Sequence, residues 1–114
     1  MPHIIVEYTD TLSSSEDIPK LLAKLHKDLA SRESIDIHGI KTRAIPVRYT
    51  VVGDGHEPDK MIHITLRLLP GRADDLKKQM AAGLVEVARE VTHHDDRISI
   101  TAEVVDMHAE SYVK

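Results

Sequence analysis

The second residue of the chain, Pro2 in MPHIIVEYTD, could act as a base once the initiator Met1 is removed. Trimming would convert the proline ring nitrogen from an amide into a free secondary amine. An α-amino group titrates near about pH 8, and burial or neighbouring cations would disfavour its charged form and lower its pKa further. A general base works best when its pKa lies near the working pH. Proline is also acceptable as the first residue of a surface strand, so a purely structural interpretation stays open.

Cationic side chains at separate points of the chain could bind an anion. Arg72 stands in LPGRADD, where a strand is expected to give way to a helix, and the N–H groups at a helix start favour anions. The alternatives for Arg72 are an ion pair with Asp74 or Asp75, or solvation. Lys41 and Arg43, in GIKTRA, are spaced so that on a strand both point to one face, either into water or toward an anion.

Thiol, metal and nucleic-acid chemistry are not indicated. The chain has no Cys and a net charge of −4, so it lacks thiolate ligands, disulfides and the basic surface of a nucleic-acid binder. His93 and His94, followed by Asp95 and Asp96, are adjacent rather than one helical turn apart, so no metal site is predicted. The GDG at 53–55 is a turn and lacks the spacing and the strand–helix setting of a nucleotide loop.

The rest of the sequence predicts the elements that hold these residues. In chain order, the periodicity indicates a strand at 3–8, a helix at 18–29, a strand at 40–52, a strand at 61–69, a helix at 76–91 and a strand at 98–104. Ser15 or Asp17 is the expected cap of the first helix, because Pro19 is tolerated only in a first turn. Pro46 implies that the second strand lies at a sheet edge or carries a bulge.

These elements predict a single α+β domain over residues 1–114, built from tandem β-α-β units with a pseudo-repeat at 2–52 and 61–107. Each crossover is long enough to join parallel strands. The simplest result is a four-stranded mixed sheet with two helices on one face. The other face carries Thr, His, Arg and Ser, and it is expected to pack against copies of the chain, because a small core gains from sharing a surface.

Composition limits the setting in which the protein works. A hydrophobic fraction of 41% and a charged fraction of 30% are those of an ordinary globular protein. No apolar stretch approaches the length of a membrane span, and the N-terminus lacks the layout of a secretory signal. A cytoplasmic location without membrane or nucleic-acid partners is therefore the expectation.

Taken together, MPHIIVEYTD, GIKTRA and PGRADD before a helix resemble the tautomerase superfamily, and within it most of all the 5-carboxymethyl-2-hydroxymuconate isomerases. The similarity extends over essentially the whole chain. It implies a homotrimer with active sites near the subunit interfaces, no metal or organic cofactor, and Pro2 as the catalytic base. It also implies that cations bind substrate carboxylates: Arg72 and Arg43 match arginines of the family by position, and Lys41 stands where the family has an arginine.

The reaction implied by this resemblance is the conversion of a carboxylated 2-hydroxymuconate-type enol to its 2-oxo-3-enoate, in the breakdown of the aromatic acid homoprotocatechuate. Neutral Pro2 would move a proton from the enol hydroxyl to a distant carbon. Lys41, Arg43 and Arg72 would anchor the carboxylates and so hold the substrate over the proline nitrogen. The substrate would be a small-molecule carboxylate.

Two other interpretations keep the same fold. A superfamily decarboxylase, hydratase or dehalogenase would use a protonated Pro2 as an acid, beside a carboxylate that activates water, and Asp36 or Glu7 could take that role. A non-catalytic trimer would merely hold anions in its cationic pocket and would retain Met1. The presence or absence of Met1 in the natural protein separates binding from catalysis.

Overall fold

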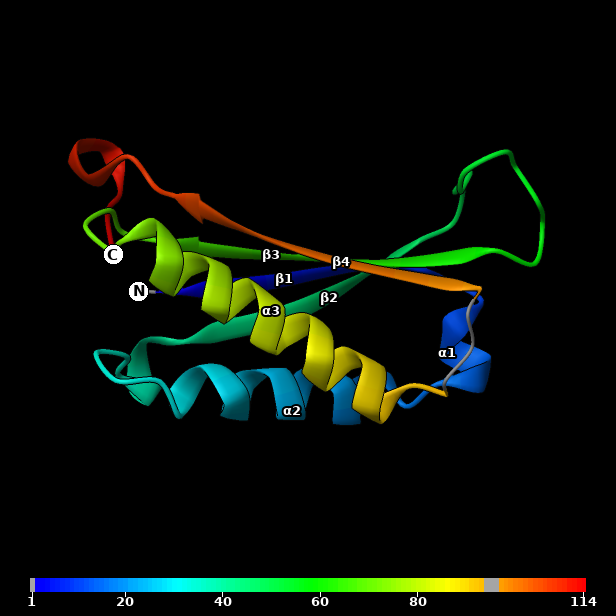
Figure 1. The fold of residues 1–114 in the computed structure, drawn as a ribbon, viewed down its shortest axis with the longest axis horizontal. Coiled ribbons are helices and arrows are strands. Elements are labelled where there is room, and N and C mark those ends of the chain that lie inside the picture. The colour runs from blue at the N-terminus through cyan, green and yellow to red at the C-terminus, as the bar shows by residue number, and fades with distance from the viewer. Residues whose placement is uncertain (1, 94–96) are drawn as a thin grey trace.

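The computed structural model, shown in Figure 1, describes residues 2–93 and 97–114. The strands of its sheet are β1 (His3–Thr9), β2 (Lys41–Val47), β3 (Lys60–Leu68) and β4 (Ile98–Asp106). The α-helices are α1 (Leu12–Ser15), α2 (Ile18–Ala30) and α3 (Asp74–Val91). Two short 3-10 helices, η1 (Ile37–Gly39) and η2 (Ala109–Ser111), complete the secondary structure of the described residues.

The four strands form one mixed sheet in the order β2-β1-β3-β4. The pairs β1–β2 and β3–β4 are parallel, and the central pair β1–β3 is antiparallel. Each parallel pair is connected through a long helix, α2 or α3, and the two long helices lie on the same side of the sheet (Figure 1). The predicted α+β fold of tandem β-α-β units is therefore confirmed. Pro46 lies on β2, an edge strand, as its missing N–H requires.

Helix α2 begins where the sequence places a cap and a proline together. The side chain of Asp17 accepts a hydrogen bond from the backbone N–H of Lys20 at 3.0 Å, so Asp17 rather than Ser15 is the cap. Pro19 lies in the first turn, where its missing N–H costs no helical bond. None of the helices in the described part of the chain is both long and apolar enough to cross a membrane.

The core lies between the sheet and the two long helices. Alternation on the central strands directs one side of each toward the helices, and this side is fully buried: Ile4 and Val6 from β1, and Ile62, Ile64, Leu66 and Leu68 from β3. The helices contribute Leu21, Leu25 and Leu29 from α2, and Met80, Leu84 and Ala88 from α3. The opposite side of the sheet, which we call the open face, carries His3, Lys41, Arg43, His63, Arg67 and Glu103.

The second strand is shorter than its sequence predicts. The extended pattern of residues 40–52 continues past Val47, but β2 ends there because Thr9, its partner in the register, is the last residue of β1. With no strand left to pair, the chain leaves the sheet as a loop before β3. The α1 turn was not predicted as a separate helix, and it forms within a stretch of helix-start residues because Leu12 is buried in the core.

The antiparallel central pair gives the sheet two unlike ends. The proline end holds Pro2, the start of β2 and the ends of β3 and β4, and both described termini of the chain lie near it (Figure 1). The far end holds the ends of β1 and β2 and the starts of β3 and β4. Helix α2 ends near the proline end, and α3 begins there.

Candidate active site

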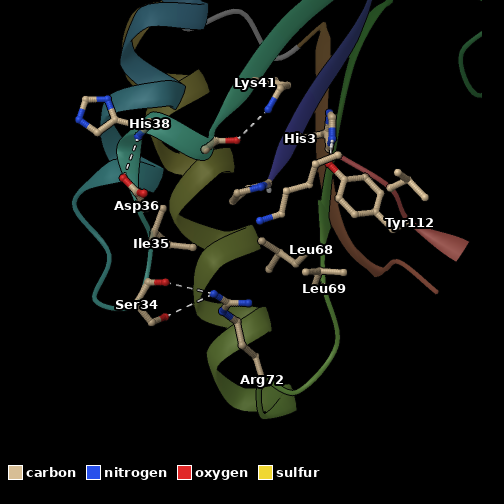
Figure 2. Close-up of a pocket in the computed structure, with 14 residues that line it drawn as sticks. His3, Ser34, Ile35, Asp36, His38, Lys41, Leu68, Leu69, Arg72 and Tyr112 are labelled. Carbon is tan, nitrogen blue, oxygen red and sulfur yellow. Dashed lines mark hydrogen bonds between the residues drawn. The ribbon is translucent and has the colours of Figure 1, made fainter. Parts of the chain in front are cut away.

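A cavity of about 670 Å³ opens at the proline end of the sheet (Figure 2). Its walls come from the starts of β1 and β2, the end of β3 and the turn before α3, the segment before η1 with η1 itself, and the last residues of the chain. Pro2, Lys41 and Arg72 all line it. These three residues are far apart in the sequence, and the fold brings them to one site.

Pro2 is buried at the wall of this cavity, directly before β1. Its carbonyl oxygen accepts a hydrogen bond from the backbone N–H of Lys41 at 3.0 Å, which fixes it against the start of β2. The residue before it, Met1, lies outside the described residues, so removal of Met1 stays a prediction. Burial of a trimmed Pro2 nitrogen at this wall would disfavour its charged form and so lower its pKa.

Arg72 reaches the cavity from the turn after β3. Gly71 makes this turn with a φ of 122°, a conformation that only glycine adopts easily. The Nη2 atom of Arg72 donates to the carbonyl oxygen of Ser34 at 3.3 Å and lies 3.5 Å from the Ser34 hydroxyl oxygen (Figure 2). The Nε of Arg72 is buried and has no hydrogen-bond partner among the described residues. The guanidinium therefore keeps donor capacity beside the cavity.

The alternative role of Arg72, an ion pair with the acids that follow it, is not seen in the described ranges. Asp74 is instead paired with Lys77, whose ammonium lies 3.4 Å from its carboxylate and 3.2 Å from that of Asp106. Asp75 and Arg72 do not form an ion pair in the described ranges. The positive charge of Arg72 is thus available to an anion in the cavity.

Lys41 and Arg43 share the open face, as their spacing predicts, but they have different surroundings. Lys41 lines the cavity, and its ammonium donates to the carbonyl oxygen of Gly39 at 3.4 Å. Arg43 does not line the cavity: its Nη1 donates to Nδ1 of His3 at 3.1 Å, and it borders a smaller hollow on the open face together with Arg67. Direct substrate binding by Arg43 stays a prediction.

His3 and Tyr112 also line the cavity, although no motif marked Tyr112. The His3 Nε2 lies 2.9 Å from the Tyr112 hydroxyl oxygen, and the two rings meet edge to face with centroids 5.9 Å apart. Burial lowers the pKa of His3 below its usual value, and the positive charges of Arg43, Lys41 and Arg67 lower it further. Both effects favour the neutral form of His3.

The two carboxylates considered for water activation lie in different places. Asp36 lines the cavity, where one of its oxygens accepts a hydrogen bond from the backbone N–H of His38 at 3.0 Å (Figure 2). Glu7 is on the open face, in register with His63, and does not line the cavity. Asp36 alone of the two could act on a ligand bound there.

The described residues contain no group of three or more His, Asp or Glu side chains arranged to hold a metal ion. His93 instead contacts Glu16: its backbone N–H and its Nδ1 each lie 2.8 Å from a carboxylate oxygen. This pairing raises the pKa of His93 above its usual value. His94, Asp95 and Asp96, which the sequence analysis considered beside it, lie outside the described residues.

Comparison with known proteins identifies close relatives. A sequence model of the family described as 5-carboxymethyl-2-hydroxymuconate isomerase matches residues 2–114. The curated 5-carboxymethyl-2-hydroxymuconate Delta-isomerase of Escherichia coli is 32% identical over 89 residues, which span 78% of this chain and 71% of that protein. The crystal structure of a 5-carboxymethyl-2-hydroxymuconate isomerase from Deinococcus radiodurans R1 is 30% identical, with a TM-score of 0.86 over 99% of this chain and 87% of that one.

A more distant structure shares the fold. A protein described as a W0 fused 4-OT wild type symmetric trimer has 17% identity and a TM-score of 0.77, and the match covers 95% of this chain and 88% of that chain. At this identity the likeness shows the fold alone.

Proposed function

The chain belongs to the 5-carboxymethyl-2-hydroxymuconate isomerase family and is an isomerase, and from this premise we propose that it converts a carboxylated 2-hydroxymuconate-type enol to its 2-oxo-3-enoate with Pro2 as the general base. The observation that carries the proposal is the shared cavity of Pro2, Lys41 and Arg72. A potential base and two cations line it from separate elements. Such a site suits a small substrate that carries a movable proton and several carboxylates.

The proposed reaction moves one proton and needs one base. The neutral Pro2 nitrogen takes the proton of the enol hydroxyl, the electrons of that O–H bond form the C=O bond, and the diene electrons shift along the carbon chain. The protonated Pro2 then delivers the same proton to the far carbon of the former diene, where a C–H bond forms. Substrate and product are isomers, so the free base is restored without any other reactant.

The cations have two proposed effects on this step. Arg72 and Lys41 bind the carboxylates and hold the carbon chain over the Pro2 nitrogen. Their positive charges also disfavour protonation of a nearby amine, which keeps Pro2 in its basic form. Lys41 is a point charge where the family is expected to have a planar, bidentate arginine, so it holds its carboxylate with less directional restraint.

We also propose that the protein is a homotrimer that acts in homoprotocatechuate breakdown in the cytoplasm. A related fold is described as a symmetric trimer, and large apolar side chains remain exposed on β2 and in the loop that follows it: Ile45, Tyr49 and Val51 are 46%, 82% and 82% exposed. Sedimentation analysis of the purified protein would give a single species of three times the chain mass. A monomer at assay concentration would contradict the trimer and leave the reaction to be tested alone.

The reaction is tested by following the ultraviolet absorbance of a 2-hydroxymuconate-type enol after adding protein that mass spectrometry shows to begin at Pro2. The absorbance of the enol should fall with rapid turnover, and the Pro2→Ala variant should be slower by about 10²-fold or more. Pro58→Ala, in the exposed loop before β3, is the matched control and should behave as the unchanged protein. Equal rates for Pro2→Ala and Pro58→Ala would refute the role of Pro2.

A second candidate is favoured by the presence of Asp36 in the cavity. In a decarboxylase, hydratase or dehalogenase, protonated Pro2 would be the acid and Asp36 would activate water. Asp36→Asn would then abolish turnover, whereas the isomerase needs no water and should keep most of its rate. If the natural protein retains Met1, neither enzyme is tenable, and the cavity would serve as an anion-binding site.

A further inference from the structure

The last residues of the chain fold back over the start of β1 and supply one wall of the cavity. The backbone N–H of Met107 donates to the carbonyl oxygen of Leu68 at 2.6 Å, and the Met107 side chain is buried, so the segment is fixed to the end of β3. After η2, the chain brings Tyr112 beside His3, where Figure 2 shows the two side chains meeting at the cavity. Lys114 lines the same wall.

The hydrogen bonds of His3 determine which of its ring nitrogens carries the proton. The guanidinium of Arg43 can only donate, so Nδ1 of His3, 3.1 Å away, must accept and carries no proton. In the neutral ring the proton is then on Nε2, which donates to the Tyr112 hydroxyl oxygen at 2.9 Å. Arg43 thus sets the direction of the His3–Tyr112 bond.

This direction leaves the proton of the Tyr112 hydroxyl unused. The oxygen accepts from His3, and no acceptor for the hydroxyl proton is found within residues 2–93 and 97–114. Tyr112 lines the cavity that holds Pro2, Lys41 and Arg72. A neutral donor that borders a cationic cavity is suited to a carboxylate oxygen, since a hydrogen bond to a charged acceptor is stronger than one to a neutral acceptor.

We propose that Tyr112 is a substrate-binding residue whose hydroxyl donates to a carboxylate of the enol, and that His3 and Arg43 are positioning residues that fix the direction of this donation. The inference rests on the proposed function, and it extends the site to the C-terminal segment. It also gives Arg43 an indirect role: the guanidinium acts through His3, in place of the direct substrate contact that the sequence predicts.

The arrangement depends on a neutral His3 and therefore on pH. Burial lowers the pKa of His3, and the positive charges of Arg43 and Lys41 from β2 and of Arg67 from β3 lower it further. When the pH falls below that lowered pKa, a proton on Nδ1 removes the acceptor of Arg43 and sets two cations against each other. The Tyr112 hydroxyl then loses its fixed orientation, and substrate binding weakens.

The kinetic test compares Tyr112→Phe with Tyr49→Phe, a matched change at an exposed tyrosine outside the cavity that keeps the apolar ring proposed for the trimer contact. Tyr112→Phe should raise KM about tenfold, the effect of one hydrogen bond to a charged group, with little change in kcat. Tyr49→Phe should leave both constants unchanged. A KM for Tyr112→Phe equal to that of Tyr49→Phe would overturn the inference, while wild-type turnover of the enol would keep the proposed function intact.

Two further measurements do not depend on turnover. Nitrogen-15 spectra of labelled imidazoles, assigned with His3→Gln, should show His3 protonated at Nε2 and unprotonated at Nδ1 near neutral pH, and Arg43→Ala should mix the two tautomers. A proton on Nδ1 in the unchanged protein would overturn the inference. Calorimetric binding of adipate, a saturated dicarboxylate, should weaken about tenfold in Tyr112→Phe. If wild type binds adipate in this Tyr112-dependent way but does not convert the enol, the proposed function fails and the binding role stands.

Discussion

The two ends of the sheet are built from the same elements, but their charged side chains differ in whether they are paired within the chain. At the far end, Glu16 and His93 satisfy each other within the chain, and the pKa of His93 is raised. At the proline end, Lys41, Arg43 and Arg72 have no carboxylate partner in the described ranges, and burial together with nearby cations lowers the pKa of His3. Both buried side-chain N–H groups without a partner in the described ranges, on Arg32 and Arg72, also belong to the proline end.

The difference indicates where a ligand completes the structure. A buried donor without an acceptor costs about 1–3 kcal/mol. The pairing of Glu16 with His93 at the far end shows that this fold can satisfy its charged groups within the chain, so the fold itself does not require the unpaired donors at the proline end. Ser34, whose carbonyl oxygen accepts from Arg72, is the only non-glycine residue in the described ranges with a positive φ, at 72°. Unused donors and backbone strain at the same end are typical of a functional site.

The largest effect is expected at the chain terminus itself, which only the proline end possesses. Protein prepared with Met1 retained has an amide nitrogen at Pro2, which cannot accept a proton at neutral pH. Its kcat for the enol should be lower than that of the trimmed protein by about 10²–10⁴-fold, the range of general base catalysis. Mass spectrometry and the absorbance assay on the same two preparations test this. Equal kcat values for the two preparations would show that the free amine of Pro2 is not the catalytic base.

The next effect separates the arginines of the two ends. Arg72→Ala should raise KM for the enol by about 10- to 100-fold with a smaller change in kcat, because it removes charged hydrogen bonds that bind substrate and transition state alike. Arg48→Ala, directly after β2 at the far end, is the matched control and should leave KM unchanged. An unaltered KM in Arg72→Ala would remove its anchoring role.

A smaller effect distinguishes two lysines with the same local structure. Lys41 and Lys60 are the first residues of β2 and β3, and the ammonium of each donates to a backbone carbonyl oxygen, at 3.4 Å and 3.3 Å. Only Lys41 lines the cavity. Lys41→Ala should raise KM about threefold to tenfold, less than Arg72→Ala, because a mobile point charge on an exposed side chain is partly screened. Lys60→Ala should have no effect, and a similar rise in both would mean that net charge alone matters.

The fold could be predicted because its signals are local. The alternation of residues 61–69 and the helical spacing of residues 18–29 each describe one element, and the lengths of the crossovers then require parallel pairs. The end of β2 could not be predicted in this way, because it depends on where β1 stops and not on the residues of β2.

The site could be predicted only as far as sequence spacing reaches. Two-residue spacing assigns Lys41 and Arg43 to one face, but it cannot show that the Arg43 guanidinium donates a hydrogen bond to His3. Tyr112 gave no signal at all, because it is 109 residues from His3 in the chain and its role depends on how the C-terminal segment folds back. Long-range contacts of single side chains leave no periodicity in a sequence.

The smallest predicted effect is a pH dependence of stability with opposite signs at the two ends. The pKa of His3 lies below its usual value of 6.5, so the unfolded chain binds a proton more readily, and stability is lost as the pH falls below 6.5 and through the lowered pKa. The pKa of His93 lies above 6.5, so its contribution is present below 6.5 and is lost as the pH rises through the raised pKa. Because both side chains are in contact with solvent, which screens their charges, each effect on stability should be small.

Urea unfolding between about pH 5 and about pH 8 tests both signs, because histidines titrate in this range. Relative to the unchanged protein, His3→Gln should gain stability at the acid end, where the penalty of His3 is removed. His93→Gln should lose stability at the acid end and approach the unchanged protein at the alkaline end, because the charged pair with Glu16 is then absent in both. Shifts of the same sign in the two variants would mean that the electrostatic contrast between the ends does not act on folding.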